Sequence, residues 1–257
     1  MFTCRYPTFA KGRILKRDML ENLRDYPRGF LDQYFQAHSD GILAGADMEV
    51  EGDTLIVRSG IIRHDGRVYM LEEPCFLPYQ ATETETIVKI RFKPADIQSD
   101  FTVYETELFL DANTHIRSDE RELGRFKLKV GARLRQDYQN FYDFATEYNT
   151  VNRIHVAYAG RGESTFNPMI LRYFAGEMLQ SGGLNPYDVA FAMACMNGTL
   201  VDRELILHYL TNRLETEYRE YTNEQIYKQL GRILEDVKHG GRSRITGKSR
   251  LQRMIVD

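Results

Sequence analysis

The sequence predicts an α+β fold made of an N-terminal amphipathic helix, a small antiparallel β-sandwich or barrel, and a C-terminal helical bundle. Apolar residues recur with a helical period over residues 13–38. Short β-prone runs separated by Gly, Asp and Pro fill residues 41–135. Helical patterns joined by short loops fill residues 167–238. We divide the chain into an arm and helix (1–40), a β-domain (41–137), a helical domain (138–238) and a flexible basic tail (239–257).

The N-terminal region is expected to attach the chain to a partner. Residues 1–12 have no clear period and form an extended arm. In the helix that follows, Pro27 should cause a break or a kink, because proline lacks the N–H and clashes with the preceding turn. An amphipathic helix in front of a β-domain must pack on that domain or on another subunit. The apolar residues that we expect to bind a partner are Ile14, Leu15, Met19 and Leu23.

Residues 41–73 form a series of short strands and tight turns, and the chain is organised around them. Alternating residues lead into a turn at Gly52-Asp53, and a second hairpin turns at Asp65-Gly66. A type I′ turn needs positive φ at both central residues, which Asp followed by Gly tolerates.

This stretch resembles the small β-module near the N-terminus of many phage tail-fibre, baseplate and receptor-binding-complex proteins. The residues that carry the resemblance are Val50, Leu55, Val57, Gly60, Ile61, Asp65, Gly66, Arg67 and Tyr69. Residues 152–177 are similar to a segment of uncharacterised phage-like proteins that contain the module. Neither segment is associated with a known activity. The resemblance therefore implies that the protein is a component of a particle, and it implies no catalytic reaction.

The rest of the β-region is predicted with less regular patterns. Residues 101–110 are β-prone but polar on both faces, which favours an edge or interface strand. Residues 118–122 are charged, and we expect an exposed loop. Residues 124–130 alternate strictly between apolar and basic side chains, which predicts a strand.

The C-terminal half shows clear helix start signals. Asn167-Pro168 and Asn185-Pro186 each place an N-cap before a proline at the first helical position. Thr222 and Gln225 form a capping box. Residues 186–196 are nearly all apolar or small, so we expect a central buried helix. The aromatic-rich residues 138–148 are expected to form a short helix that joins the two domains.

The motif search predicts no catalytic, cofactor or metal site. The six histidines lack zinc-ligand spacing, and the three cysteines are too far apart in sequence for a Cys-x-x-Cys site. Gly247-Lys248-Ser249 lacks the earlier glycine of a phosphate-binding loop, and Gly-x-Ser-x-Gly is absent. No apolar run is long enough to cross a membrane, and residues 1–13 lack the pattern of a signal peptide. An enzyme with an unrecognised site is therefore the weakest alternative.

The C-terminal tail is the one strongly charged feature. Its basic residues are Lys238, Arg242, Arg244, Lys248, Arg250 and Arg253. Such a tail can contact the phosphates of nucleic acid or dock on an acidic subunit. The net charge of the whole chain is −3, which favours a protein partner.

We therefore predict a non-enzymatic structural component of a phage or phage-tail-like particle, at the level of the baseplate or tail-fibre attachment. It is expected to be made in the bacterial cytoplasm and to form homo- or hetero-oligomers with other tail or baseplate proteins. The alternative is a nucleic-acid-binding accessory protein that uses the basic tail.

Overall fold

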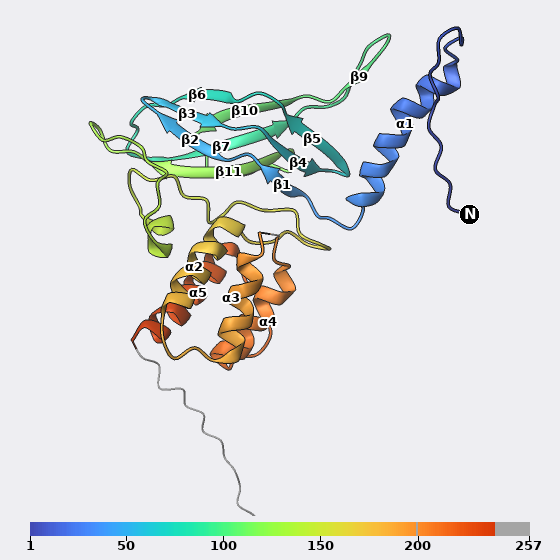
Figure 1. The fold of residues 1–257 in the computed structure, drawn as a ribbon. Coiled ribbons are helices and arrows are strands. Elements are labelled where there is room, and N and C mark those ends of the chain that lie inside the picture. The colour runs from blue at the N-terminus through green and yellow to red at the C-terminus, as the bar shows by residue number, and fades with distance from the viewer. Residues whose placement is uncertain (199, 240–257) are drawn as a thin grey trace, which may run out of the picture.

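The computed structural model describes residues 1–198 and 200–239 and shows strands stacked above a group of helices (Figure 1). Helix α1 spans Arg17–Tyr34 and precedes all the strands. The strands are β1 (Gly41–Gly45), β2 (Met48–Glu51), β3 (Thr54–Val57), β4 (Gly60–His64), β5 (Arg67–Leu71), β6 (Cys75–Pro78), β7 (Glu85–Phe92), β8 (Asp96–Ile97), β9 (Thr102–Val103), β10 (Thr106–Asp111) and β11 (Glu120–Lys127). The helices that follow are η1 (Phe141–Ala145), α2 (Pro168–Gln180), α3 (Pro186–Met196), α4 (Arg203–Leu214) and α5 (Asn223–Lys238). The predicted α+β class is confirmed.

The strands form small antiparallel sheets. The three-stranded sheets have the orders β1-β4-β5, β2-β3-β6 and β10-β7-β11, and β8 pairs with β9. Side chains from all three of the larger sheets meet in one hydrophobic cluster, which includes Ile62, Leu55, Val88 and Leu123. No sheet in the described part of the chain closes on itself, so the barrel alternative is wrong. The sandwich and bundle arrangements stay predictions.

The β4–β5 hairpin is built around the Asp65-Gly66 turn. His64 pairs with Arg67, and the two residues between them have φ values of 47° and 72°. Positive φ at both positions is the type I′ geometry. At the other end of β4, a Cβ on Gly60 would lie 2.2 Å from the backbone nitrogen of Ala46, so only glycine fits there.

We expect Gly66→Ala to lower the free energy of unfolding by about 1 kcal/mol, because a left-handed backbone is costly for a residue with a Cβ. A Cβ at Gly66 meets no atom within 4 Å, so the cost is purely conformational. Urea unfolding measures it. The matched control is Gly176→Ala inside α2, which also meets no atom but should stabilise by about 0.5–1 kcal/mol. Equal shifts of the same sign for the two variants would contradict this account.

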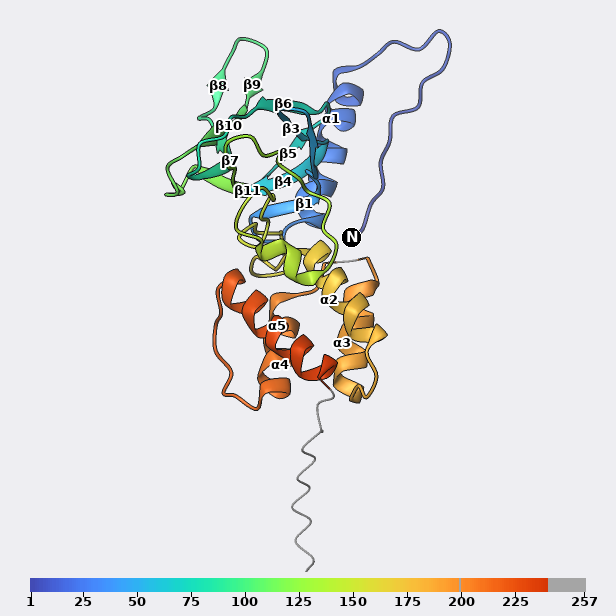
Figure 2. The same ribbon diagram turned by 90° about the vertical axis from the view of Figure 1, so that its left-hand side faces the viewer.

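The C-terminal helices begin where the sequence predicts. The Asn167 side chain accepts from the Met169 N–H at 2.9 Å, and Thr222 and Gln225 form the predicted capping box. A second hydrophobic cluster contains residues of all four helices α2, α3, α4 and α5, and it includes Phe141 and Phe144 of η1. Figure 2 shows η1 between the sheets and the helices.

Two predictions for the β-region need correction. The run 101–110 is not one strand but splits into β9, which pairs with β8, and β10, whose place beside β7 at the edge of its sheet confirms the predicted edge position. Residues 118–122 are not an exposed loop, because β11 begins at Glu120, which is 2% exposed. Burial is possible because the Glu120 carboxylate is surrounded by cationic side chains, including Lys89 at 3.4 Å.

Two predictions for the helical region also need correction. Helix α3 is not wholly buried, since one side packs inward while Tyr187 and Met193 are exposed. Its composition is apolar on all sides, so periodicity could not distinguish the two faces. Within residues 138–148 the helix is a 3₁₀ turn, and its Phe141 and Phe144 are fully buried.

Candidate protein-binding site on helix α1

Helix α1 runs without interruption through Pro27, so the predicted break does not occur, and the alternative of a kink stays a prediction. Proline leaves the carbonyl of the residue four positions earlier without its helical donor. All residues from Leu23 to Leu31 are exposed, so water can bond to that carbonyl. The helix begins at Arg17, which places the predicted partner-binding residues Ile14 and Leu15 in the exposed segment before it.

Continuity through Pro27 creates a single broad apolar surface. At about 100° per residue, eight positions follow one another in steps of about 20° and cover about 140° of the helix. We call them the apolar stripe, and its members are Met19, Leu20, Leu23, Tyr26, Pro27, Phe30, Leu31 and Tyr34. The remaining positions of the helix are all charged, amide or glycine residues.

The chain itself leaves most of the apolar stripe uncovered, although the Tyr26 hydroxyl lies 3.8 Å from Cys4 Sγ of the N-terminal arm. No residue of α1, which lies wholly within the described part of the chain, is buried. Six large side chains of the stripe are 42–63% exposed, with Leu31 the least and Tyr34 the most exposed. Met19 is half-buried beside the N-terminal arm. A stripe of this width normally faces a protein core.

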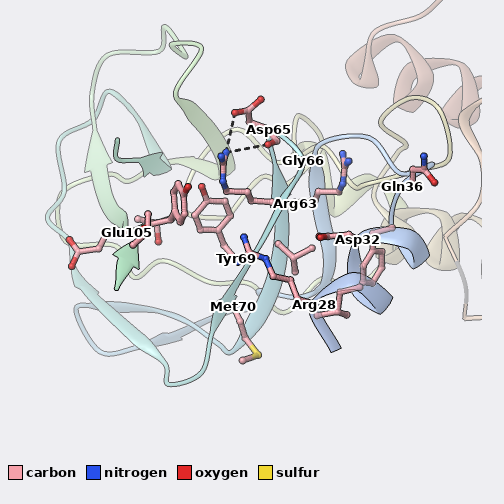
Figure 3. A pocket seen from close by; sticks show the side chains of 16 residues that line it. Arg28, Asp32, Gln36, Arg63, Asp65, Gly66, Tyr69, Met70 and Glu105 are labelled. Carbon is pink, nitrogen blue, oxygen red and sulfur yellow. Dashed lines mark hydrogen bonds and ion pairs between the residues drawn. The ribbon is translucent and has the colours of Figure 1, made fainter. Parts of the chain in front are cut away.

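The opposite side of α1 faces the β-sheets across a groove of about 1090 Å³. Figure 3 shows Arg28, Asp32 and Gln36 on one side of this groove and the β4–β5 hairpin on the other. Leu31, at the margin of the stripe, also lines it. The helix thus turns its polar face to its own chain and its apolar stripe away from it.

The hairpin that faces the groove is held by charged and aromatic contacts. The Arg67 guanidinium lies 4.4 Å from the centre of the Tyr104 ring and 3.3 Å from a carboxylate oxygen of Asp65. Tyr69 packs edge-on against Phe92 at 5.0 Å between ring centres. Arg67 and Tyr69 of the module are therefore held in place by contacts within the chain.

His64 lies at the base of the same hairpin. Its ring stacks on Phe92 at 3.8 Å, and its Nδ1 lies 3.4 Å from a carboxylate oxygen of Asp40. Burial lowers the pKa of His64, and the positive charge of Arg121 adds to this effect. A lowered pKa favours the neutral ring in the folded state, so its contribution to stability is present above pH 6.5 and is lost at lower pH.

Of the basic residues predicted at this end of the chain, only Lys238, just before the tail, lies in the described part. Lys238, at the end of α5, pairs with Glu177 and lies 5.5 Å from the Tyr142 ring centre. The other basic residues, which are Arg242, Arg244, Lys248, Arg250 and Arg253, lie outside the described residues. The nucleic-acid alternative that depends on them stays a prediction.

Sequence reasoning missed the second half of the stripe as part of the binding surface. Tyr26, Phe30, Leu31 and Tyr34 continue the face of Met19 and Leu23 at a period of 3.6 residues. This period could have revealed the full surface, because the apolar positions before and after Pro27 lie on the same side of one continuous helix.

The described residues show neither a metal-binding cluster nor a membrane-spanning helix. Within residues 1–198 and 200–239, no group of three or more His, Cys, Asp or Glu side chains is placed to hold a metal ion. None of the helices that the structure describes is both long and apolar enough to cross a membrane.

Comparison with known proteins gives coarse likeness to solved structures only. No family model matches the chain, and no curated protein matches it. A crystal structure of TssK matches with a TM-score of 0.39 and 12% identity over 92% of this chain and 69% of that one. The TssK-TssF-TssG baseplate subcomplex of the type VI secretion system, solved by cryo-electron microscopy, contains a chain that matches with a TM-score of 0.38, at 10% identity over 91% of this chain and 99% of that one. A chain of the type VI secretion baseplate complex matches with a TM-score of 0.36, at 12% identity over 91% of this chain and all of that one.

Proposed function

We propose that this chain is a non-enzymatic structural subunit of a phage or phage-tail-like particle, at the level of the baseplate or tail-fibre attachment. It works through protein–protein contacts, and the apolar stripe of α1 is its main contact surface. The observation that carries the proposal is the orientation of α1, whose polar face is turned to its own chain and whose apolar stripe is left in water. Such a surface is typical of proteins that bury it in an assembly.

The type of assembly is inferred from the hairpin module. The residues from Gly41 to Glu73 resemble a module of tail-fibre and baseplate proteins, and in this chain they fold into β1 to β5. In this proposal residues 1–40 attach the chain to other tail or baseplate proteins. The β-domain supplies a rigid body, and the helical domain contacts the next subunit. The protein is made in the cytoplasm and then joins the particle.

The proposal is tested with two matched double variants of the full chain. Leu23→Glu with Phe30→Glu places two charges on the apolar stripe, seven residues apart. Asn22→Glu with Gly29→Glu places the same charges at the same spacing on the polar side, where a Cβ on Gly29 meets nothing within 4 Å. Each variant is mixed with the products of neighbouring genes, and complexes are measured by sedimentation.

We expect the stripe variant to lose about 100-fold or more in affinity, because each large apolar side chain that is buried in an interface contributes about 1.5–3 kcal/mol. The polar-side variant should bind like the unaltered chain. Equal behaviour of both variants, in complexes with neighbouring products and in association with further copies of this chain, would contradict the proposal.

A further inference from the structure

We infer that the apolar stripe of α1 binds the α1 helix of a second copy of this chain, with the two helices parallel and in register. This inference rests on the proposed function and names the occupant of its contact surface. It follows from the spacing, the charge and the size of the stripe.

The spacing of the stripe indicates a helix as the occupant. Its central residues are three, four, three and four positions apart, and they are Leu20, Leu23, Pro27, Phe30 and Tyr34. This is the spacing with which one helix packs its side chains between those of another. In a parallel pair each residue meets its own counterpart, so every layer of the contact contains side chains of equal size.

The charges of α1 favour another copy over a strongly charged partner. The helix has three arginines and four acidic residues, a net charge of −1. Arg17 pairs with Glu21 at 2.7 Å and Arg24 with Asp25 at 2.6 Å within the same helix. These pairs leave little net charge to attract an acidic or basic partner. Because each helix has a net charge of only −1, two copies repel each other weakly.

The same charges select the parallel orientation. Arg17 and Arg24 are seven residues apart and lie on one side of the five central residues, while Met19 and Tyr26, at one margin of the stripe, lie on the other side. In a parallel pair the two different flanks meet, so the arginines of one copy lie beside apolar side chains of the other. An antiparallel pair would bring the arginine flanks of both copies together, where like charges repel.

The stripe is also large enough for a specific contact. Six large side chains of the stripe are about half exposed. Because an aromatic side chain can bury about 150–250 Å², their exposed parts together amount to on the order of 700 Å² of surface on each copy. Specific interfaces bury about 600–1,000 Å² on each partner. The rise of about 1.5 Å per residue makes the helix about 27 Å long, which is enough for all five layers to form.

The inference is tested by disulfide formation between copies of the full chain. Cys4 and Cys75 are replaced by serine to remove the accessible native thiols, and Leu20→Cys is added in the middle of the stripe. A parallel, in-register pair brings the two new thiols together, so mild oxidation should give a dimer on a non-reducing gel. Gly29→Cys, on the opposite side of the helix, is the matched control and should cross-link at least tenfold more slowly.

Light scattering of the unaltered chain completes the test. The inference is supported if the unaltered chain forms an oligomer and the double variant Leu23→Glu with Phe30→Glu does not. A chain that stays monomeric, with equal cross-linking at both cysteine positions, overturns it. If that monomer still binds a neighbouring gene product through the stripe, the proposed function stands and only the second copy is excluded as the occupant. If the oligomer survives the stripe substitutions, copies associate through another surface and the inference is also overturned.

Discussion

Replacing Glu120 with alanine is expected to lower the free energy of unfolding by about 3 kcal/mol, at the low end of the cost of breaking a buried ion pair. Glu120 is 2% exposed, and its carboxylate contacts Lys89 at 3.4 Å, Arg91 at 3.0 Å and Arg117 at 2.8 Å. Lys89 is itself 1% exposed, so the substitution leaves a buried cation with less compensation. The loss is moderate because Lys89 keeps Asp111 at 2.9 Å and the His115 carbonyl at 2.7 Å.

The same group makes stability depend on acidity. Burial alone would raise the pKa of Glu120, but the hydrogen bonds from Arg91 and Arg117 and the charge of Lys89 outweigh burial and hold the pKa at about 2. A folded-state pKa below the ordinary value of 4.5 means that the stabilisation is full above pH 4.5 and is lost as the pH falls toward 2.

Urea unfolding at pH 7 and at pH 3 tests both statements about Glu120. The difference between the unaltered chain and Glu120→Ala should be large at pH 7 and smaller at pH 3. Glu49→Ala is the control, because its partner Arg58 is a surface residue and its removal should leave the unfolding midpoint unchanged. A Glu120→Ala midpoint that matches this control at pH 7 would show that the buried network does not stabilise the fold.

The second large effect is expected for Phe174→Ala in α2, with a loss of about 3–5 kcal/mol. Phe174 is fully buried, and its ring lies within 5.8–6.3 Å, centre to centre, of the rings of Phe141, Phe191 and Tyr209. Truncation removes the ring and leaves a cavity among aromatic neighbours that are held on three different segments, which are η1, α3 and α4. Such a cavity cannot collapse easily, which places the cost in the upper part of the range for core substitutions.

Thermal or urea unfolding measures the effect of Phe174→Ala, and Tyr187→Ala on α3 is the control. Tyr187 is 69% exposed, so its truncation should change the free energy of unfolding by less than about 0.5 kcal/mol. If Phe174→Ala separates unfolding into two transitions, the helical and β-domains unfold independently. A Phe174 variant as stable as the Tyr187 variant would contradict the packing described for α2.

The fold was predictable where local signals agree with tertiary packing. The Asp65-Gly66 turn requires positive φ at two residues, and few other pairs of residues allow it. Asn167, Asn185 and Thr222 mark helix starts because their side chains accept from backbone N–H groups that would otherwise lack partners. These effects depend on a few adjacent residues, so the sequence alone reveals them.

The failures have the opposite cause. Glu120 lies in a buried strand and not in the predicted exposed loop, because its burial depends on Lys89 and Arg91, which are about thirty positions away in the chain. Pro27 does not break α1, because the cost of a missing hydrogen bond depends on exposure to water, which local sequence does not give. The candidate site was half predicted, since Met19 and Leu23 lie in the stripe while Ile14 and Leu15 precede the helix.

The central claim is that the apolar stripe of α1 is covered by protein in the assembled particle. The most direct measurement is the rate of maleimide labelling of Leu23→Cys, in a chain without Cys4 and Cys75, before and after assembly with its partners. Gly29→Cys on the polar side is the control. The account predicts that, in the assembled particle, position 23 is labelled at least tenfold more slowly than position 29, whether a second copy or another protein covers the stripe. Equal labelling of Leu23→Cys and Gly29→Cys in the particle would contradict it.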